Sequence, residues 1–147
     1  MIDTENIKKY VYLIHIIIPI LLAIIINVIM NRQKLYIKDY EPNKYLPPGY
    51  IIGIVWVIIL GFLGYAHYLK HNSITSFYII LIIVYCLSYP FLTYKKSEEE
   101  AQVYNLIAVI LAITLFIMIF IDNMYDSLYI LPFLLWCTYV FIVTTFL

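Results

Sequence analysis

The sequence predicts an all-α membrane protein, a five-transmembrane-helix bundle with a long loop between its first and second helices. Composition is the first observation: 65% of the 147 residues are apolar and only 12% are charged. A soluble domain carries about a quarter charged residues, and a soluble monomer this apolar would expose patches larger than such proteins tolerate. Membrane lipid is therefore the expected surrounding of most side chains.

Charge-free runs are the second observation. Five of them are each about 21 to 25 residues long, and a helix needs about 20 residues to cross the bilayer core. Lipid forces every backbone group to bond within its own segment, so helices override the strand preference of Ile, Val and Tyr. We expect one domain, 1–147, with helices at residues 10–31, 48–69, 73–94, 101–121 and 126–147.

The third observation is the spacing of these runs, because only the first connection is long. Residues 32–47 separate the first two expected helices, and long loops in compact domains are often functional. We interpret them as a pocket-covering loop. Six of the nine Lys and Arg residues lie on the side of this loop and the C-terminus. That bias places both in the cytoplasm, although Lys8 and Lys9 favour the opposite orientation.

Prolines and acidic residues indicate local features of the helices. Pro19, Pro90 and Pro132 fall inside expected helices, where each frees a carbonyl and is expected to bend its helix. Three bends would leave room for a cavity, although membrane helices also tolerate proline without one. The acidic run 98–100 is typical of a helix start, where it complements the helix dipole. His15 is either a functional group or a neutral residue bonded within the bundle.

Several function classes find no support in the sequence. The net charge is zero, so the electrostatic pattern of nucleic-acid binding is missing and no nucleic-acid partner is expected. Cys86 and Cys137 have no metal-ligand spacing and are interpreted as small buried apolar residues. Catalytic triads, paired intramembrane carboxylates and phosphate loops are also missing. We therefore assign no catalytic residue, no metal ligand and no required cofactor.

Tyrosine is unusually abundant, with sixteen residues. Many are expected at the membrane interfaces, but five lie deeper in their runs, where a hydroxyl needs a partner. They could line a flat aromatic pocket or bond between helices. These five are Tyr50, Tyr65, Tyr85, Tyr89 and Tyr139.

Two segments carry a resemblance to a known family. Residues 47–69, PPGYIIGIVWVIILGFLGYAHYL, resemble P-P-G-W-x-F-G-P-x-W in the second helix of the translocator protein family, also called tryptophan-rich sensory proteins or peripheral-type benzodiazepine receptors. Residues 131–139, LPFLLWCTY, are similar to the fifth-helix pattern L-P-Y-x-x-W-x-x-F. Both tryptophans, Trp56 and Trp136, fall on family tryptophan positions. Tyr36 and Glu41-Pro42 resemble a loop pattern, W-Y-x-x-L-x-K-P, and in the third helix only Pro90 is retained.

The resemblance implies a five-helix bundle with a pocket that opens on the long-loop side. Family members bind tetrapyrroles, such as haem and protoporphyrin, and other lipophilic ligands, and many form homodimers. The implied function is a membrane receptor or carrier with a tetrapyrrole as its ligand. A light- or oxygen-dependent porphyrin-degrading enzyme of the same fold and a structural or assembly subunit remain alternatives. The candidate ligand-binding residues are Tyr36, Pro47, Tyr50, Gly53, Trp56, Tyr85, Tyr89, Trp136 and Tyr139.

Overall fold

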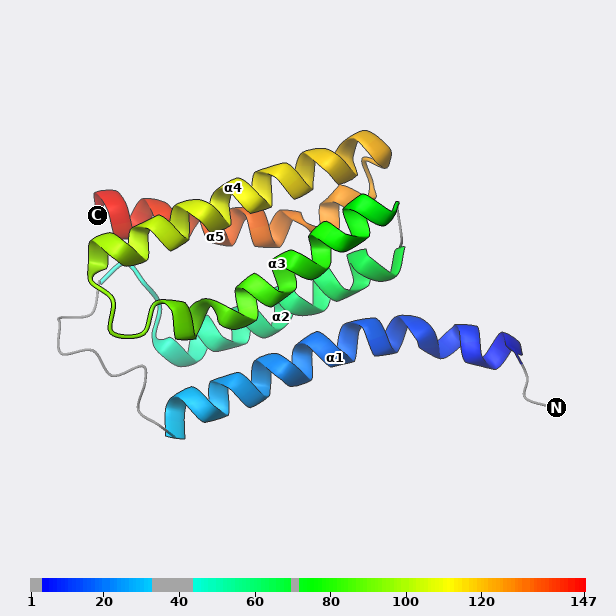
Figure 1. Cartoon of the computed structure of the whole chain (residues 1–147), viewed down its shortest axis with the longest axis horizontal. Helices are drawn as coiled ribbons and strands as arrows, with labels where there is room; N and C mark the ends of the chain where they lie inside the picture. Colours follow the sequence, from blue (N-terminus) through cyan, green and yellow to red (C-terminus); the bar gives the residue numbers. More distant parts are fainter. Residues whose placement is uncertain (1–3, 33–43, 70–71) are drawn as a thin grey trace.

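The structure is a computed structural model that describes residues 4–32, 44–69 and 72–147. Its described residues form helices without any strand, which confirms the all-α fold. Successive helices run in alternating directions, and the chain ends lie at opposite ends of the bundle (Figure 1). In order, the elements are α1 (Thr4–Arg32), α2 (Gly49–Leu69), α3 (Ser73–Leu92), α4 (Glu98–Asp122), the short 3-10 helix η1 (Asp126–Tyr129) and α5 (Leu131–Phe146).

Four of these helices, α1 to α4, are long and apolar enough to cross a membrane. The fifth is apolar but has only 16 residues, so the expected helix at 126–147 begins too early. Proline explains the late start, because its missing N–H is harmless only in the first helical turn. Pro132 occupies that turn of α5. The predicted bend at Pro132 is therefore wrong, whereas Pro19 and Pro90 do lie inside α1 and α3.

Two further helices start before their apolar runs because polar turns extend them, whereas α3 ends at Leu92, before the expected residue 94. α1 begins at Thr4 and α4 at Glu98, in both cases before the apolar run. A capping box starts α4: the Ser97 hydroxyl accepts from Glu100 N at 3.2 Å, and Glu100 Oε2 accepts from Ser97 N at 3.0 Å. These bonds satisfy N–H groups at the start of the helix, which have no carbonyl of a preceding helical turn to donate to. The acidic residues 98–100 therefore start a helix, as predicted.

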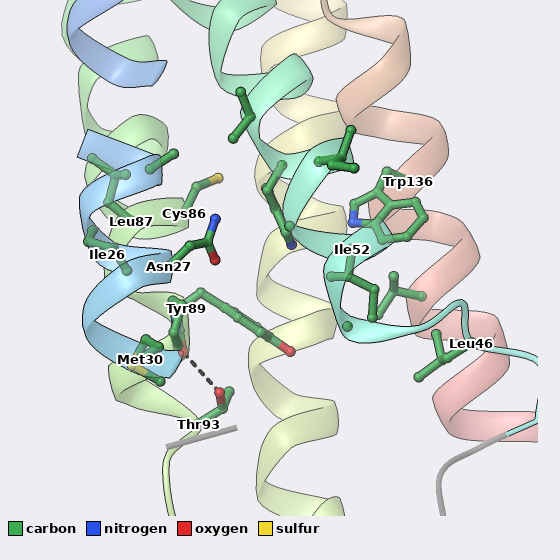
Figure 2. Close-up of a pocket in the computed structure, with 18 of the residues that line it drawn as sticks. Ile26, Asn27, Met30, Leu46, Ile52, Cys86, Leu87, Tyr89, Thr93 and Trp136 are labelled. Carbon is green, nitrogen blue, oxygen red and sulfur yellow. Dashed lines mark hydrogen bonds between the residues drawn. The ribbon is translucent and has the colours of Figure 1, made fainter. Parts of the chain in front are cut away.

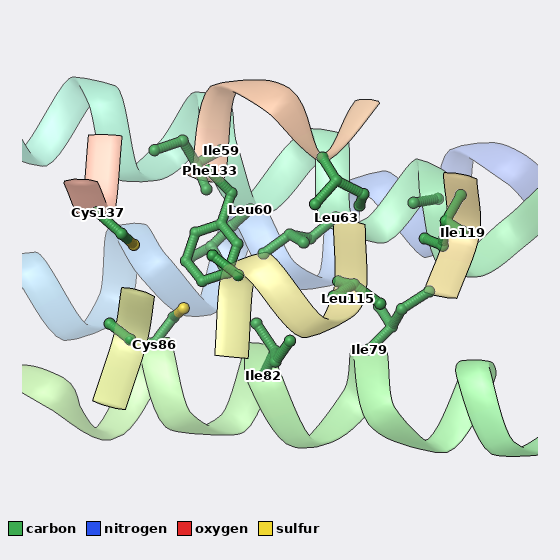
Figure 3. Packing of buried hydrophobic residues seen from close by; sticks show 14 of the residues in the cluster. Ile59, Leu60, Leu63, Ile79, Ile82, Cys86, Leu115, Ile119, Phe133 and Cys137 are labelled. Atoms are coloured by element: carbon green, nitrogen blue, oxygen red, sulfur yellow. The ribbon is translucent and has the colours of Figure 1, made fainter. Parts of the chain in front are cut away.

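The packed core joins α2, α3, α4 and α5 (Figure 3). Leu60 and Leu63 of α2 meet Ile82 of α3, Leu115 of α4 and Phe133 of α5, and all five side chains are almost fully buried. In lipid, such contacts stabilise a bundle by van der Waals packing, because lipid tails are as apolar as the side chains themselves. Helices α2 to α5 thus share one packed core.

Helix α1 is peripheral and lies along α2 (Figure 1). Their backbones approach most closely at Gly64, where an added Cβ would lie 2.1 Å from the carbonyl oxygen of His15. At Gly61 a Cβ would meet only side-chain atoms of α1, the nearest at 3.1 Å, and at Gly53 the nearest would be Asn27 Nδ2 at 3.5 Å. The two helices therefore separate from the Gly64 end toward the Gly53 end.

We predict that Gly64→Ala destabilises the protein, because its methyl group would collide with the α1 backbone, which cannot move without shifting the helix. Overpacking of this kind costs roughly 1–3 kcal/mol. Thermal unfolding followed by circular dichroism in detergent measures the effect. Gly49→Ala is the control, since nothing lies within 4 Å of its added Cβ. Equal midpoints for both variants would contradict the close approach.

Candidate ligand cavity

The end of the bundle where α1 and α2 separate contains a cavity of about 1360 Å³. Its wall comes from the last turns of α1 and α3, the first turns of α2 and α4, the end of α5 and residues 44–48. Ordinary small-molecule pockets measure about 300–1,000 Å³, so this one has room for a large ligand. It lies at the end of the bundle where the long connection joins α1 to α2 and where the C-terminus lies (Figure 1).

Seven of the nine residues selected from the sequence line this cavity: Pro47, Tyr50, Gly53, Trp56, Tyr85, Tyr89 and Trp136. Tyr139 is not among the cavity residues. It is 41% exposed on α5, and its hydroxyl donates to the backbone carbonyl of Tyr45. Tyr36 lies outside the described residues. The structure thus brings together residues from α2, α3 and α5 that are far apart in the sequence.

The start of α2 positions its part of the wall. The carbonyl of Pro48 accepts from the N–H groups of Ile51 at 2.9 Å and Ile52 at 3.2 Å, so this proline caps the helix instead of lying in its first turn. Tyr50, Gly53 and Trp56 then follow at intervals of three residues along one helix face. Gly53 has no side chain, which leaves room for the Asn27 side chain of α1 against the α2 backbone.

Aromatic rings form the inner wall. The Trp56 ring lies 6.4 Å from the Tyr89 ring and 6.5 Å from the Phe133 ring, measured between centroids. Both separations fall in the range at which aromatic pairs attract each other. The Tyr85 hydroxyl donates to the Tyr104 carbonyl at 2.7 Å, so it bonds α3 to α4. Tyr85 and Tyr89 therefore both line the pocket and bond helices together, which combines the two roles expected from the sequence. Tyr65 and Tyr139 are not among the residues of the pocket.

A polar network that sequence reasoning missed lies in the cavity wall around Asn105 of α4. The Asn105 side chain accepts from the Tyr89 hydroxyl and donates through Nδ2 to Thr144 Oγ1 at 3.1 Å. Gln102 Nε2 donates to the Thr144 carbonyl at 2.9 Å. These bonds join α3, α4 and α5. The signal was available, because an amide inside an apolar membrane run is itself a functional candidate.

Trp136 in the cavity wall has an indole N–H without a hydrogen-bond partner among the described residues. Its Nε1 is buried, and the ring lies between α5 and α2 (Figure 2). A buried donor left without an acceptor costs about 1–3 kcal/mol. An acceptor on a bound ligand would recover that free energy after a small rotation of the ring.

The titratable residues of the described chain offer little for metal chemistry. In residues 4–32, 44–69 and 72–147, no three His, Cys, Asp or Glu side chains gather as metal ligands do. Cys86 and Cys137 are free, buried and part of the cavity wall. His15 lies away from the cavity, donates through Nδ1 to the Val11 carbonyl at 2.9 Å and has its ring 5.1 Å from that of His67.

A sequence model of the TspO/MBR family matches residues 15–147. The chain belongs to the TspO/MBR family. The match includes all of α2 to α5 and most of α1, and it confirms the resemblance to the translocator proteins. Together with four helices able to cross a bilayer, it identifies an integral membrane protein of that family. Searches of curated proteins and of solved structures found no match.

We predict that Thr144→Val lowers the free energy of unfolding, because it removes the hydroxyl that accepts from Asn105 Nδ2. Hydrogen bonds between membrane helices are worth about 0.6 kcal/mol on average and up to about 1.7 kcal/mol. Unfolding of the purified protein in mixed micelles measures the change.

Thr114→Val is the matched control for this substitution. The Thr114 hydroxyl bonds only to the Ile110 carbonyl of its own helix, at 2.8 Å, and is exposed. The Thr114 variant should keep the parent stability within about 0.5 kcal/mol. The network would have no stabilising role if both valine variants unfolded alike.

Proposed function

We propose that this TspO/MBR protein is a membrane receptor or carrier that binds tetrapyrroles, protoporphyrin or haem, and other flat lipophilic ligands in its cavity. The observation that carries the proposal is that both tryptophans of the chain, Trp56 on α2 and Trp136 on α5, line one large cavity. Large apolar walls with few polar groups suit flat, lipophilic ligands.

The polar residues of the cavity support an orientation for such a ligand. Lys44 lies at the mouth, with its ammonium 4.9 Å from the Tyr45 ring centroid. A carboxylate on the edge of a porphyrin would find this cation at the rim, where water also reaches it. The apolar macrocycle would then face the rings of Trp56, Tyr89 and Trp136. The proposal rests on packing against the ring faces, so protoporphyrin should bind as well as haem.

The test is a titration of the purified protein with protoporphyrin in the dark, followed by the shift of the ligand's Soret band. The parent chain should bind with saturation near one ligand per chain. Trp136→Phe replaces the indole by a smaller ring, so its Kd should rise about three- to tenfold, the equivalent of one aromatic contact. Trp56→Phe should also weaken binding because it shortens the wall.

Tyr125→Phe is the control, because Tyr125 is exposed and lies in the turn between α4 and η1, remote from the cavity. Its Kd should equal that of the parent. A linear, nonsaturable shift that is identical in all variants would mean partitioning into detergent and would reject the proposal. Repeating the titration under illumination separates binding from breakdown, since a porphyrin-degrading enzyme would bleach the Soret band at a rate dependent on Trp56 and Trp136.

A further inference from the structure

A second, smaller hollow lies between α2 and α5 on the outside of the bundle. This side groove has a volume of about 460 Å³ and a lining that is almost entirely apolar. Leu135 is 60% exposed and Ile58 51% exposed at its rim. Its residues are Val55, Ile58, Ile59, Pro132, Leu135, Trp136 and Tyr139.

The depth of the side groove identifies what lies against it. Helix α2 has 21 residues, or about 32 Å at 1.5 Å per residue, and Ile58 lies roughly 14 Å from its first residue. Ile58 is thus near the middle of a helix able to cross a membrane. In a bilayer that level contains acyl chains and no headgroups. The occupant that fits is an aliphatic chain or another lipophile dissolved in the bilayer.

Trp136 and Ile58 separate the side groove from the cavity, because both residues are part of both linings. The backbones of α2 and α5 make little direct contact, because α5 packs mainly on α4 and α2 packs on α1 and α3. Side chains fill the space between these two helices, and the Trp136 ring lies between α5 and α2 (Figure 2). The indole N–H has no partner among the described residues, and the ring packs on Tyr139 at 5.8 Å. No hydrogen bond from its own side chain therefore fixes the ring in place.

We infer that the side groove takes lipophilic molecules from the acyl-chain layer and is a lateral entrance to the cavity, with Trp136 as the movable partition. A rotation of one ring joins the two hollows without moving any helix. A ligand that enters this way never crosses water, so its low solubility does not limit binding. The inference rests on the proposed function for the identity of the ligand that passes through.

Filling the groove tests the entrance. The double variant Val55→Phe, Leu135→Phe adds bulk to residues that line the groove and not the cavity. An entrance lies on the path in both directions, so its obstruction slows entry and exit equally and leaves the equilibrium unchanged. In lipid nanodiscs loaded with protoporphyrin, association and dissociation rates should both fall about tenfold, within the range of mutational effects on binding rates. The Kd should stay within twofold of the parent.

Two further variants make the kinetic result decisive. Leu135→Ala widens the rim, so both rates should rise, and because Leu135 is exposed this change should not affect folding. Ile113→Phe is the matched control, since Ile113 is an exposed residue of α4 outside both hollows, and its rates should equal those of the parent. Saturable binding with unchanged rates in the filled variant would overturn the inference and place the entrance at the loop end.

A readout without porphyrin separates this inference from the proposed function. In a Trp56→Phe background, Trp136 is the only tryptophan, and phosphatidylcholine brominated at mid-chain quenches the fluorescence of a tryptophan that it contacts. Filling the groove should relieve that quenching at least twofold, and Ile113→Phe should not. Relief without saturable porphyrin binding would reject the proposed ligand and retain the groove as an acyl-chain site. Quenching that filling leaves unchanged would overturn the inference, whatever the cavity binds.

Discussion

The contact between Gly64 of α2 and the backbone of His15 on α1 determines much of the architecture. A glycine there lets two helix backbones meet, and Pro19 packs beside the same glycine with its Cγ 3.2 Å from the added Cβ position. Toward the loop end, side chains such as Asn27 lie between the two helices. The cavity at that end is lined by residues of all five helices.

Lipid dictates how the polar residues are used. The bilayer core offers no water to hydrogen bond, so each amide or hydroxyl needs a protein partner or leaves a site for a ligand. Tyr89, Asn105 and Thr144 satisfy one another across three helices. The Trp136 indole does not find such a partner in the described residues. The cavity wall therefore contains a hydrogen-bonded network of polar side chains and one indole N–H without a partner among the described residues.

The sequence was sufficient for the fold because lipid leaves few alternatives. Apolar runs and short connections predicted the helices, and motif positions brought Trp56 and Trp136 to one cavity. Helix ends were harder to predict from hydropathy. The start of α4 is set by its capping box, and the start of α5 is set by a proline in its first turn. The amide of Asn105 in an apolar run could have been singled out from the sequence, but its bond to Thr144 is visible only once the helices are packed together. Tyr139 was expected in the cavity but does not line it. The position of a residue along an apolar run does not tell which side of the helix it faces.

Helix α1 supplies one wall of the cavity but only one side chain, Ala23, to the buried core cluster. Helix α1 contacts mainly α2, yet Ala23, Asn27 and Met30 supply a full side of the hollow. A change of tilt in α1 about the Gly64 contact alters the width of the hollow without repacking α2 to α5. Substitutions in α1 can therefore change the size of the cavity while the packing of α2 to α5 stays the same.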